Sequence, residues 1–186
     1  MQTALDNPLV SILFTVAAVG ILGWNLQPLE SLGVALALML LCIDQGRMAL
    51  VDLTNIRQIP LNDPQVERFH TVTLITITLE LLGFYLAWMQ LGLGTALVLI
   101  SQLFFNTAAK VQLYPGNLEP IQPFGVKERS PVLIANTVAL GLVALWQSNQ
   151  LRQITAALLL AIVVVYLALK YLAINTAATA NGDERP

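Results

Sequence analysis

The sequence predicts an all-α integral membrane protein, a six-transmembrane-helix bundle built of three consecutive helical hairpins. Hydrophobic residues make up 56% of the chain and charged residues 11%, whereas soluble proteins carry about 25% charged residues. The stretch from Thr71 to Ala109 contains one acidic or basic side chain, Glu80. A membrane span needs roughly 20 apolar residues, so this stretch is long enough for two. Gly92 and Gly94 interrupt it and mark the turn between them.

Each predicted hairpin opens on a polar residue followed by proline. These dipeptides are Asn7-Pro8, Asp63-Pro64 and Ser130-Pro131. The polar residue suits the N-cap of a helix, and proline suits its first turn. Polar or proline-containing connectors separate the apolar runs. The predicted spans are 8–26, 31–51, 66–89, 94–113, 131–147 and 151–174.

The six spans form a single predicted transmembrane bundle over residues 1–174. What remains of the chain is too short for a separate soluble domain. The tail over residues 175–186 is small and polar, which predicts disorder. The first apolar run has neither a basic flank nor a small-residue cleavage site before the next connector, so we expect it to be a retained span.

The basic residues predict that both termini are cytoplasmic. With an even number of spans, eight of the nine Lys and Arg residues fall on or near the cytoplasmic side, and only Arg152 lies outside. The eight are Arg47, Arg57, Arg68, Lys110, Lys127, Arg129, Lys170 and Arg185. This pattern fits a plasma or inner membrane and an internal membrane such as the thylakoid equally well.

Polar residues of the third and fourth spans predict an intramembrane polar seam. Glu80 lies about halfway along the third span, where a charged side chain costs about 2.5–3.5 kcal/mol and therefore needs a partner or a proton. On the fourth span, Gln102, Asn106 and Lys110 recur at every fourth residue and so share one helix face. Gln102 is the one expected nearest in depth to Glu80.

Asp44 and Arg47, near the inner end of the second span, complete the predicted polar seam. They are one helical turn apart and are expected to pair with each other. The seam could be a proton or ion relay, or a pocket for a polar headgroup or cofactor. Alternatively, its members fix helix packing through contacts of roughly 0.6–2 kcal/mol each. For Asp44 and Arg47 the structural role is the favoured interpretation.

The sequence offers few ligands for a metal or cofactor. The single cysteine, Cys42, and the single histidine, His70, exclude an internal disulfide, a multi-cysteine metal site and a haem held by two histidines of this chain. His70 could supply one axial ligand to a haem or a chlorophyll magnesium. A lone interfacial histidine beside Glu67 and Arg68 is more often solvated, however, so no cofactor is assigned.

The connector from Tyr114 to Ser130 is longer than the 2–8 residues usual between bundled helices, and prolines stiffen it. It is predicted to be a loop at the membrane interface that either lies over the polar seam or contacts a partner protein. The candidate contact residues are Tyr114, Phe124, Lys127, Glu128 and Arg129.

Three functions remain open at this level. The favoured hypothesis is a non-catalytic subunit or assembly factor of a larger membrane complex, because no known catalytic or nucleotide-binding motif is present. The alternative is a small transporter or channel-like carrier that uses Glu80. A third is a membrane enzyme that acts on a lipid or isoprenoid with Asp44, Glu80 or Glu119 as acid or base.

The expected partners are the lipid bilayer and other membrane proteins. A net charge of −2 gives no basic surface of the kind that nucleic acid requires.

Overall fold

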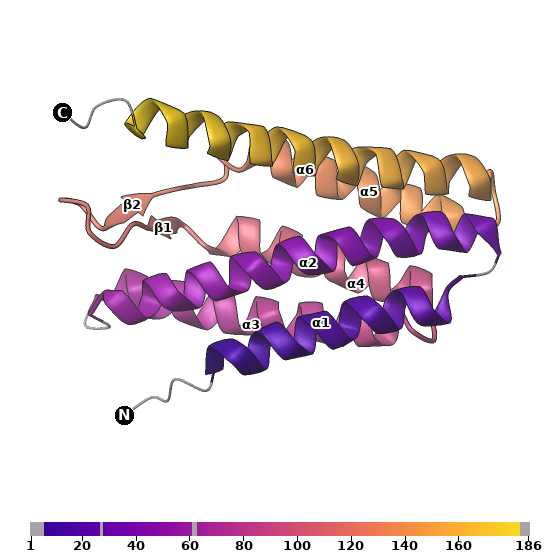
Figure 1. Ribbon diagram of the computed structural model, residues 1–186, viewed down its shortest axis with the longest axis horizontal. Coiled ribbons are helices and arrows are strands. Elements are labelled where there is room, and N and C mark those ends of the chain that lie inside the picture. Colours follow the sequence, from indigo (N-terminus) through magenta and orange to yellow (C-terminus); the bar gives the residue numbers. More distant parts are fainter. Residues whose placement is uncertain (1–5, 27, 61–62, 183–186) are drawn as a thin grey trace.

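The fold is known from a computed structural model that describes residues 6–26, 28–60 and 63–182, with side chains described from residue 8 to residue 172 within these ranges (Figure 1). The helices are α1 (Asp6–Trp24), α2 (Leu29–Gln58), α3 (Pro64–Leu86), α4 (Leu91–Ala108), α5 (Ser130–Gln147) and α6 (Arg152–Gly182). Two short strands, β1 (Val111–Leu113) and β2 (Ile121–Pro123), lie between α4 and α5.

The helices form a closed ring. The pairs in contact around the ring are α1–α2, α2–α6, α6–α5, α5–α4, α4–α3 and α3–α1. In Figure 1, α5 and α6 lie along one side of the bundle and α1 and α3 along the other, with α2 between them. Helix α2 also contacts α3 and α4, so it is the most central helix.

Strands β1 and β2 form an antiparallel hairpin in which Gln112 faces Gln122. This hairpin lies at the end of the bundle where α2 ends and α3 begins, which we call the hairpin end (Figure 1). Helix α1 begins and α6 ends at this same end. The cytoplasmic location of the hairpin end remains a prediction from the basic residues.

The structure supports the expected membrane fold. Within the described residues, five helices, α2 to α6, are long and apolar enough to cross a membrane. Helix α1 contributes a shorter apolar segment, Pro8–Trp24. The chain is therefore an all-α, multi-pass membrane protein, and the count of six spans remains a prediction.

Several helix ends differ from the predicted spans. Helix α2 continues past residue 51 to Gln58, two residues before Pro60, because hydropathy marks where a helix leaves hydrocarbon and not where its hydrogen bonds end. Helix α4 ends at Ala108, so Lys110 lies beyond it. Helix α6 runs to Gly182, so most of the segment predicted to be a disordered tail is helical, and residues 183–186 lie outside the described residues.

Local signals explain where α3 begins. Asp63 is its N-cap, and its carboxylate accepts a hydrogen bond of 2.7 Å from the backbone N–H of Gln65, with Pro64 in the first turn. This geometry is the one that the Asp63-Pro64 dipeptide predicts.

Two large apolar clusters and a small one between α2 and α6 fill the bundle. One large cluster joins α1 to α6 and includes Phe14, Leu38, Phe84 and Val98. The other large cluster lies at the hairpin end and includes Phe69. Polar side chains occupy the boundary between the two large clusters, and this boundary is where the candidate site lies.

Glycines allow α3 and α4 to approach closely near their connecting turn. A methyl group added to Gly94 would overlap backbone atoms of Gly83 and Ala87, which cannot move aside as a side chain can. We therefore expect Gly94→Ala to destabilise the protein by about 1–3 kcal/mol. Thermal unfolding of the detergent-solubilised protein, followed by tryptophan fluorescence, measures this effect.

Gly141→Ala is the matched control, because no other atom lies within 4 Å of the position that the new methyl group would occupy on the exposed face of α5. It should leave stability unchanged or raise it by about 0.5–1 kcal/mol. Equal unfolding midpoints for the two variants would contradict the close α3–α4 packing.

Candidate functional site: a polar cavity inside the bundle

A cavity of about 220 Å³, which we call the polar cavity, lies between α2, α3, α4 and α6 near the hairpin end. Its charged lining residues come from four different segments: Asp52, Glu80, Arg129 and Lys170. Of the predicted polar seam, Glu80, Gln102 and Asn106 line this cavity. Lys110 does not, because α4 ends before it.

Three buried polar atoms around the polar cavity have no hydrogen-bond partner within the described part of the chain. They are Glu80 Oε1, Thr73 Oγ1 and Gln102 Nε2. Glu80 is only 2% exposed. A buried polar atom left unpaired costs about 1–3 kcal/mol, so such atoms in native proteins generally contact water or a ligand. The cavity has room for several water molecules or a small polar solute.

Asp44 pairs with Lys170 rather than with Arg47. The Lys170 ammonium donates to both Asp44 carboxylate oxygens, at 2.8 and 2.7 Å, and the Tyr171 hydroxyl donates to Oδ1 at 3.4 Å. The Arg47 guanidinium instead lies 5.1 Å from the centre of the Tyr171 ring. The ion pair joins α2 to α6, two helices that are distant in sequence.

Arg129 closes the polar cavity at the hairpin end. Its guanidinium donates to the Phe124 carbonyl at 3.2 Å, to the Val111 carbonyl at 3.2 Å and to Asn106 Oδ1 at 3.3 Å. It also lies 5.1 Å from the Phe105 ring centre and 4.9 Å from that of Phe124. The contacts tie β1 and the segment after β2 to the end of α4.

The sequence predicts Arg129 to be a contact residue of a surface loop, but this side chain is buried, with 7% exposure. Burial lowers the pKa of its guanidinium, and the nearby Asp52 carboxylate opposes this shift. Tyr114, Lys127 and Glu128 are exposed, as a contact surface requires. Phe124 is half-buried because its ring packs on Arg129.

The remaining candidate residues lie away from the polar cavity. Lys110 lines a separate pocket of about 330 Å³ together with Arg68. His70 is half-buried near the start of α3 and does not line the polar cavity. No group of three or more His, Cys, Asp or Glu side chains within the described residues is placed to hold a metal ion.

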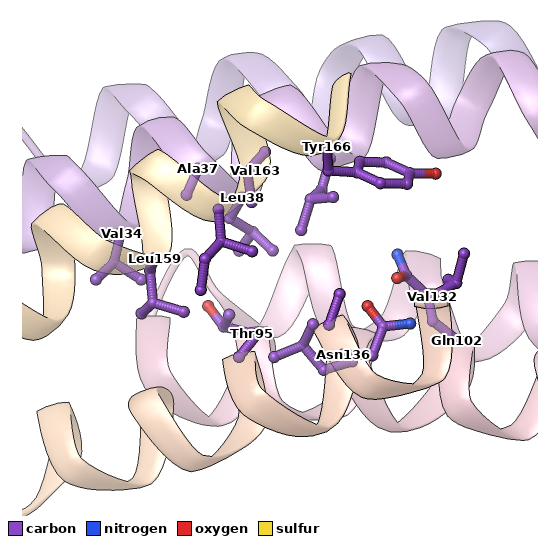
Figure 2. A pocket seen from close by; sticks show the side chains of 15 residues that line it. Val34, Ala37, Leu38, Thr95, Gln102, Val132, Asn136, Leu159, Val163 and Tyr166 are labelled. Atoms are coloured by element: carbon purple, nitrogen blue, oxygen red, sulfur yellow. The ribbon is translucent and has the colours of Figure 1, made fainter. Parts of the chain in front are cut away.

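A second, smaller cavity of about 40 Å³ lies beside the polar cavity, between α2, α4, α5 and α6, and we call it the apolar cavity (Figure 2). Gln102, Val132 and Tyr166 line both cavities. Figure 2 shows these three side chains together at one end, with Val34 and Leu159 at the other. The polar residues that line the apolar cavity include Asn136 and Thr95. Asn136 Nδ2 is another buried atom without a hydrogen-bond partner in the described chain.

Sequence reasoning missed Asp52, Lys170 and the buried role of Arg129. Asp52 follows Asp44 by eight residues, so the two acids fall near one face of any helix that continues that far. Extending the second span past residue 51 would have found Asp52. No local signal identifies Lys170 as a cavity residue, because its position depends on the packing of α6 against α2.

No protein-family model matches the chain, and neither a curated protein nor a solved structure matches it. The function is therefore inferred from the side chains of the cavity themselves.

Arg129→Lys tests whether the contacts of Arg129 hold the β1–β2 hairpin in place. Lysine keeps the charge but lacks the planar fork that bonds three acceptors at once. We expect the β1–β2 hairpin to lose amide protection by about 2 kcal/mol, the size of one or two charged hydrogen bonds. Hydrogen–deuterium exchange of residues 111–124 measures this loss.

Lys127→Gln, at an exposed position two residues earlier, is the control and should leave the exchange unchanged. Unchanged exchange in Arg129→Lys as well would show that the hairpin is held by other contacts.

Proposed function

We propose that this protein is a small transporter or channel-like carrier whose polar cavity holds the solute, with Glu80 as the functional acid. The observation that carries the proposal is the set of unpartnered buried atoms on Glu80, Thr73 and Gln102 around one cavity. Ionisable residues inside a membrane are costly and typically mark solute or ion routes. Residues that serve only to hold helices together would instead be bonded to each other across the interface.

The second supporting observation is the contact between the two cavities. The polar cavity lies toward the hairpin end, where Arg129 closes it, and the apolar cavity leads from Gln102 and Tyr166 toward the opposite end, past Thr95 and Val34 near the starts of α4 and α2. A hydrated half followed by a narrow apolar half is the arrangement expected of a gated route. Gln102, Val132 and Tyr166 form its constriction.

The enzyme hypothesis receives less support. Its three candidate acids do not share a site: Asp44 is neutralised by Lys170, and Glu119 lies exposed in the β1–β2 turn. Glu80 alone of the three lines the polar cavity.

Glu80→Gln tests the carrier proposal. Purified protein in proteoliposomes should move at least one of a panel of small solutes, measured by charge movement for ions and by osmotic swelling for neutral compounds. Replacing the acid by an isosteric amide should reduce that flux at least about tenfold with folding intact, since the loss of one charged contact typically costs about 1.5–3 kcal/mol.

Thr78→Val, on the exposed face of α3, is the control and should keep full flux. If Glu80→Leu raises the unfolding temperature while Glu80→Gln leaves flux unchanged, Glu80 acts in packing and the carrier proposal fails.

A role as a subunit or assembly factor is the second candidate, and one observation favours it. Apolar side chains are exposed on and beside the β1–β2 hairpin: Leu118 is fully exposed, and Val126 is more than half exposed. Exposed apolar groups on a rigid hairpin are suited to contact another protein.

Leu118→Asp tests the subunit role. The charge should remove a protein partner from the hairpin and shift the native complex, solubilised in mild detergent, to lower mass. Glu119→Gln, at the neighbouring exposed position, should leave the mass unchanged. If wild type and Leu118→Asp migrate alike as the isolated chain, the hairpin has no stable partner.

A further inference from the structure

The positively charged side chains that line the polar cavity are already bonded to other groups of the protein. Lys170 donates to both oxygens of Asp44 and lies 5.5 Å from the Tyr166 ring centre. Arg129 donates to three acceptors and lies between two aromatic rings. Neither side chain therefore offers the free, converging donors that an anion site requires.

The carboxyl groups, in contrast, are free. Neither Asp52 nor Glu80 has a hydrogen bond or an ion pair within the described part of the chain, and both line the polar cavity. Asp52 lies in the field of Arg129 and Lys170 but forms no direct bond with either. The Thr73 hydroxyl, which is also without a partner in the described chain, can add a third oxygen ligand to the cavity.

The formal charges around the cavity leave one negative charge uncompensated. Asp44 neutralises Lys170, so the other charged lining residues decide the sum: ionised Asp52 and Glu80 contribute −2 and Arg129 contributes +1, which gives −1. One monovalent cation brings this sum to zero. A divalent ion would leave a net positive charge at a depth where uncompensated charge is costly, and the described residues supply no cluster of three acidic, His or Cys ligands for it.

We propose that the polar cavity binds one monovalent cation through the carboxyl groups of Asp52 and Glu80. The cation is either a proton held by the two acids or a small alkali or ammonium ion. This inference rests on the proposed carrier function and names its solute class. Asp52 lies nearer the hairpin end of α2, and Glu80 lies deeper on α3, with Thr73 between them in depth. Asp52 thus receives the ion, and Glu80 holds it beside Gln102.

Binding is measured separately from transport. Detergent-solubilised protein is unfolded by heat in chloride salts of Na⁺, K⁺ and NH₄⁺ at constant ionic strength, with N-methylglucamine as the bulky reference cation. A bound ion raises the unfolding midpoint in a saturable manner. Asp52→Asn should weaken the apparent affinity about tenfold, because it removes one of the two negative charges that attract the ion, and Glu80→Gln should abolish the effect.

A proton is detected by potentiometric titration between about pH 6 and 9, where ordinary carboxylates and lysines do not titrate. Wild type should then bind about one proton more across this range than Glu80→Gln, with no preference among the salts. Glu119→Gln removes an exposed acid outside the cavity and is the control for both measurements.

Equal midpoints in all salts, together with equal titrations of wild type and Glu80→Gln, would overturn the cation site. If flux of a neutral solute depends on Glu80 while both binding measurements fail, the carrier proposal stands and the cation assignment falls. Cation binding without any flux would overturn the carrier proposal and leave the cation site in place.

Discussion

Polar groups placed at hydrocarbon depth must be paired, protonated or hydrated, and this constraint organises the bundle. The acids Asp44 and Glu80 meet this constraint in two different ways. Asp44 is paired, since both of its oxygens accept from Lys170. Glu80 is not paired, and it lines a cavity of about 220 Å³. If packing alone had shaped the interior, apolar side chains would fill this volume, as they do in the clusters on either side. This difference between the two acids is the reason for assigning a structural role to Asp44 and for proposing a functional one for Glu80.

The Asp44–Lys170 pair also determines where the cavity can be. It attaches the last helix to the second and so completes the ring α1–α2–α6–α5–α4–α3. With α6 in this position, Tyr166 lies one turn from Lys170 and contributes to the walls of both cavities. Breaking a buried pair leaves an uncompensated charge, which costs about 3–5 kcal/mol. A second ion pair, between Arg152 and Glu30 with 3.8 Å between the charged atoms, joins the same two helices near their starts.

Local sequence patterns were sufficient for the helices and for half of the candidate site. The apolar runs predicted the all-α membrane fold. The four-residue spacing of Gln102 and Asn106, on the helix that forms a hairpin with the Glu80 helix, predicted that these two residues and Glu80 lie together. Hydropathy could not place Asp52, because α2 continues after its apolar stretch ends. The role of Lys170 depends on contacts between helices far apart in sequence. Strands of three residues with proline at a strand end carry too little periodicity to predict the β1–β2 hairpin.

Arg129 connects the polar cavity and the β1–β2 hairpin, the two parts of the protein for which functions are proposed. Through Phe124 and Val111 it holds the hairpin, and through Asn106 it holds the end of α4, where the Asn106 amide in turn donates to the Gln102 carbonyl at 2.8 Å. Gln102 lines both cavities. A partner that displaced the hairpin would have to break the Arg129 contacts, and this would open the hairpin end of the polar cavity. Subunit contact and solute movement are therefore not competing accounts of this chain, because one guanidinium is common to both.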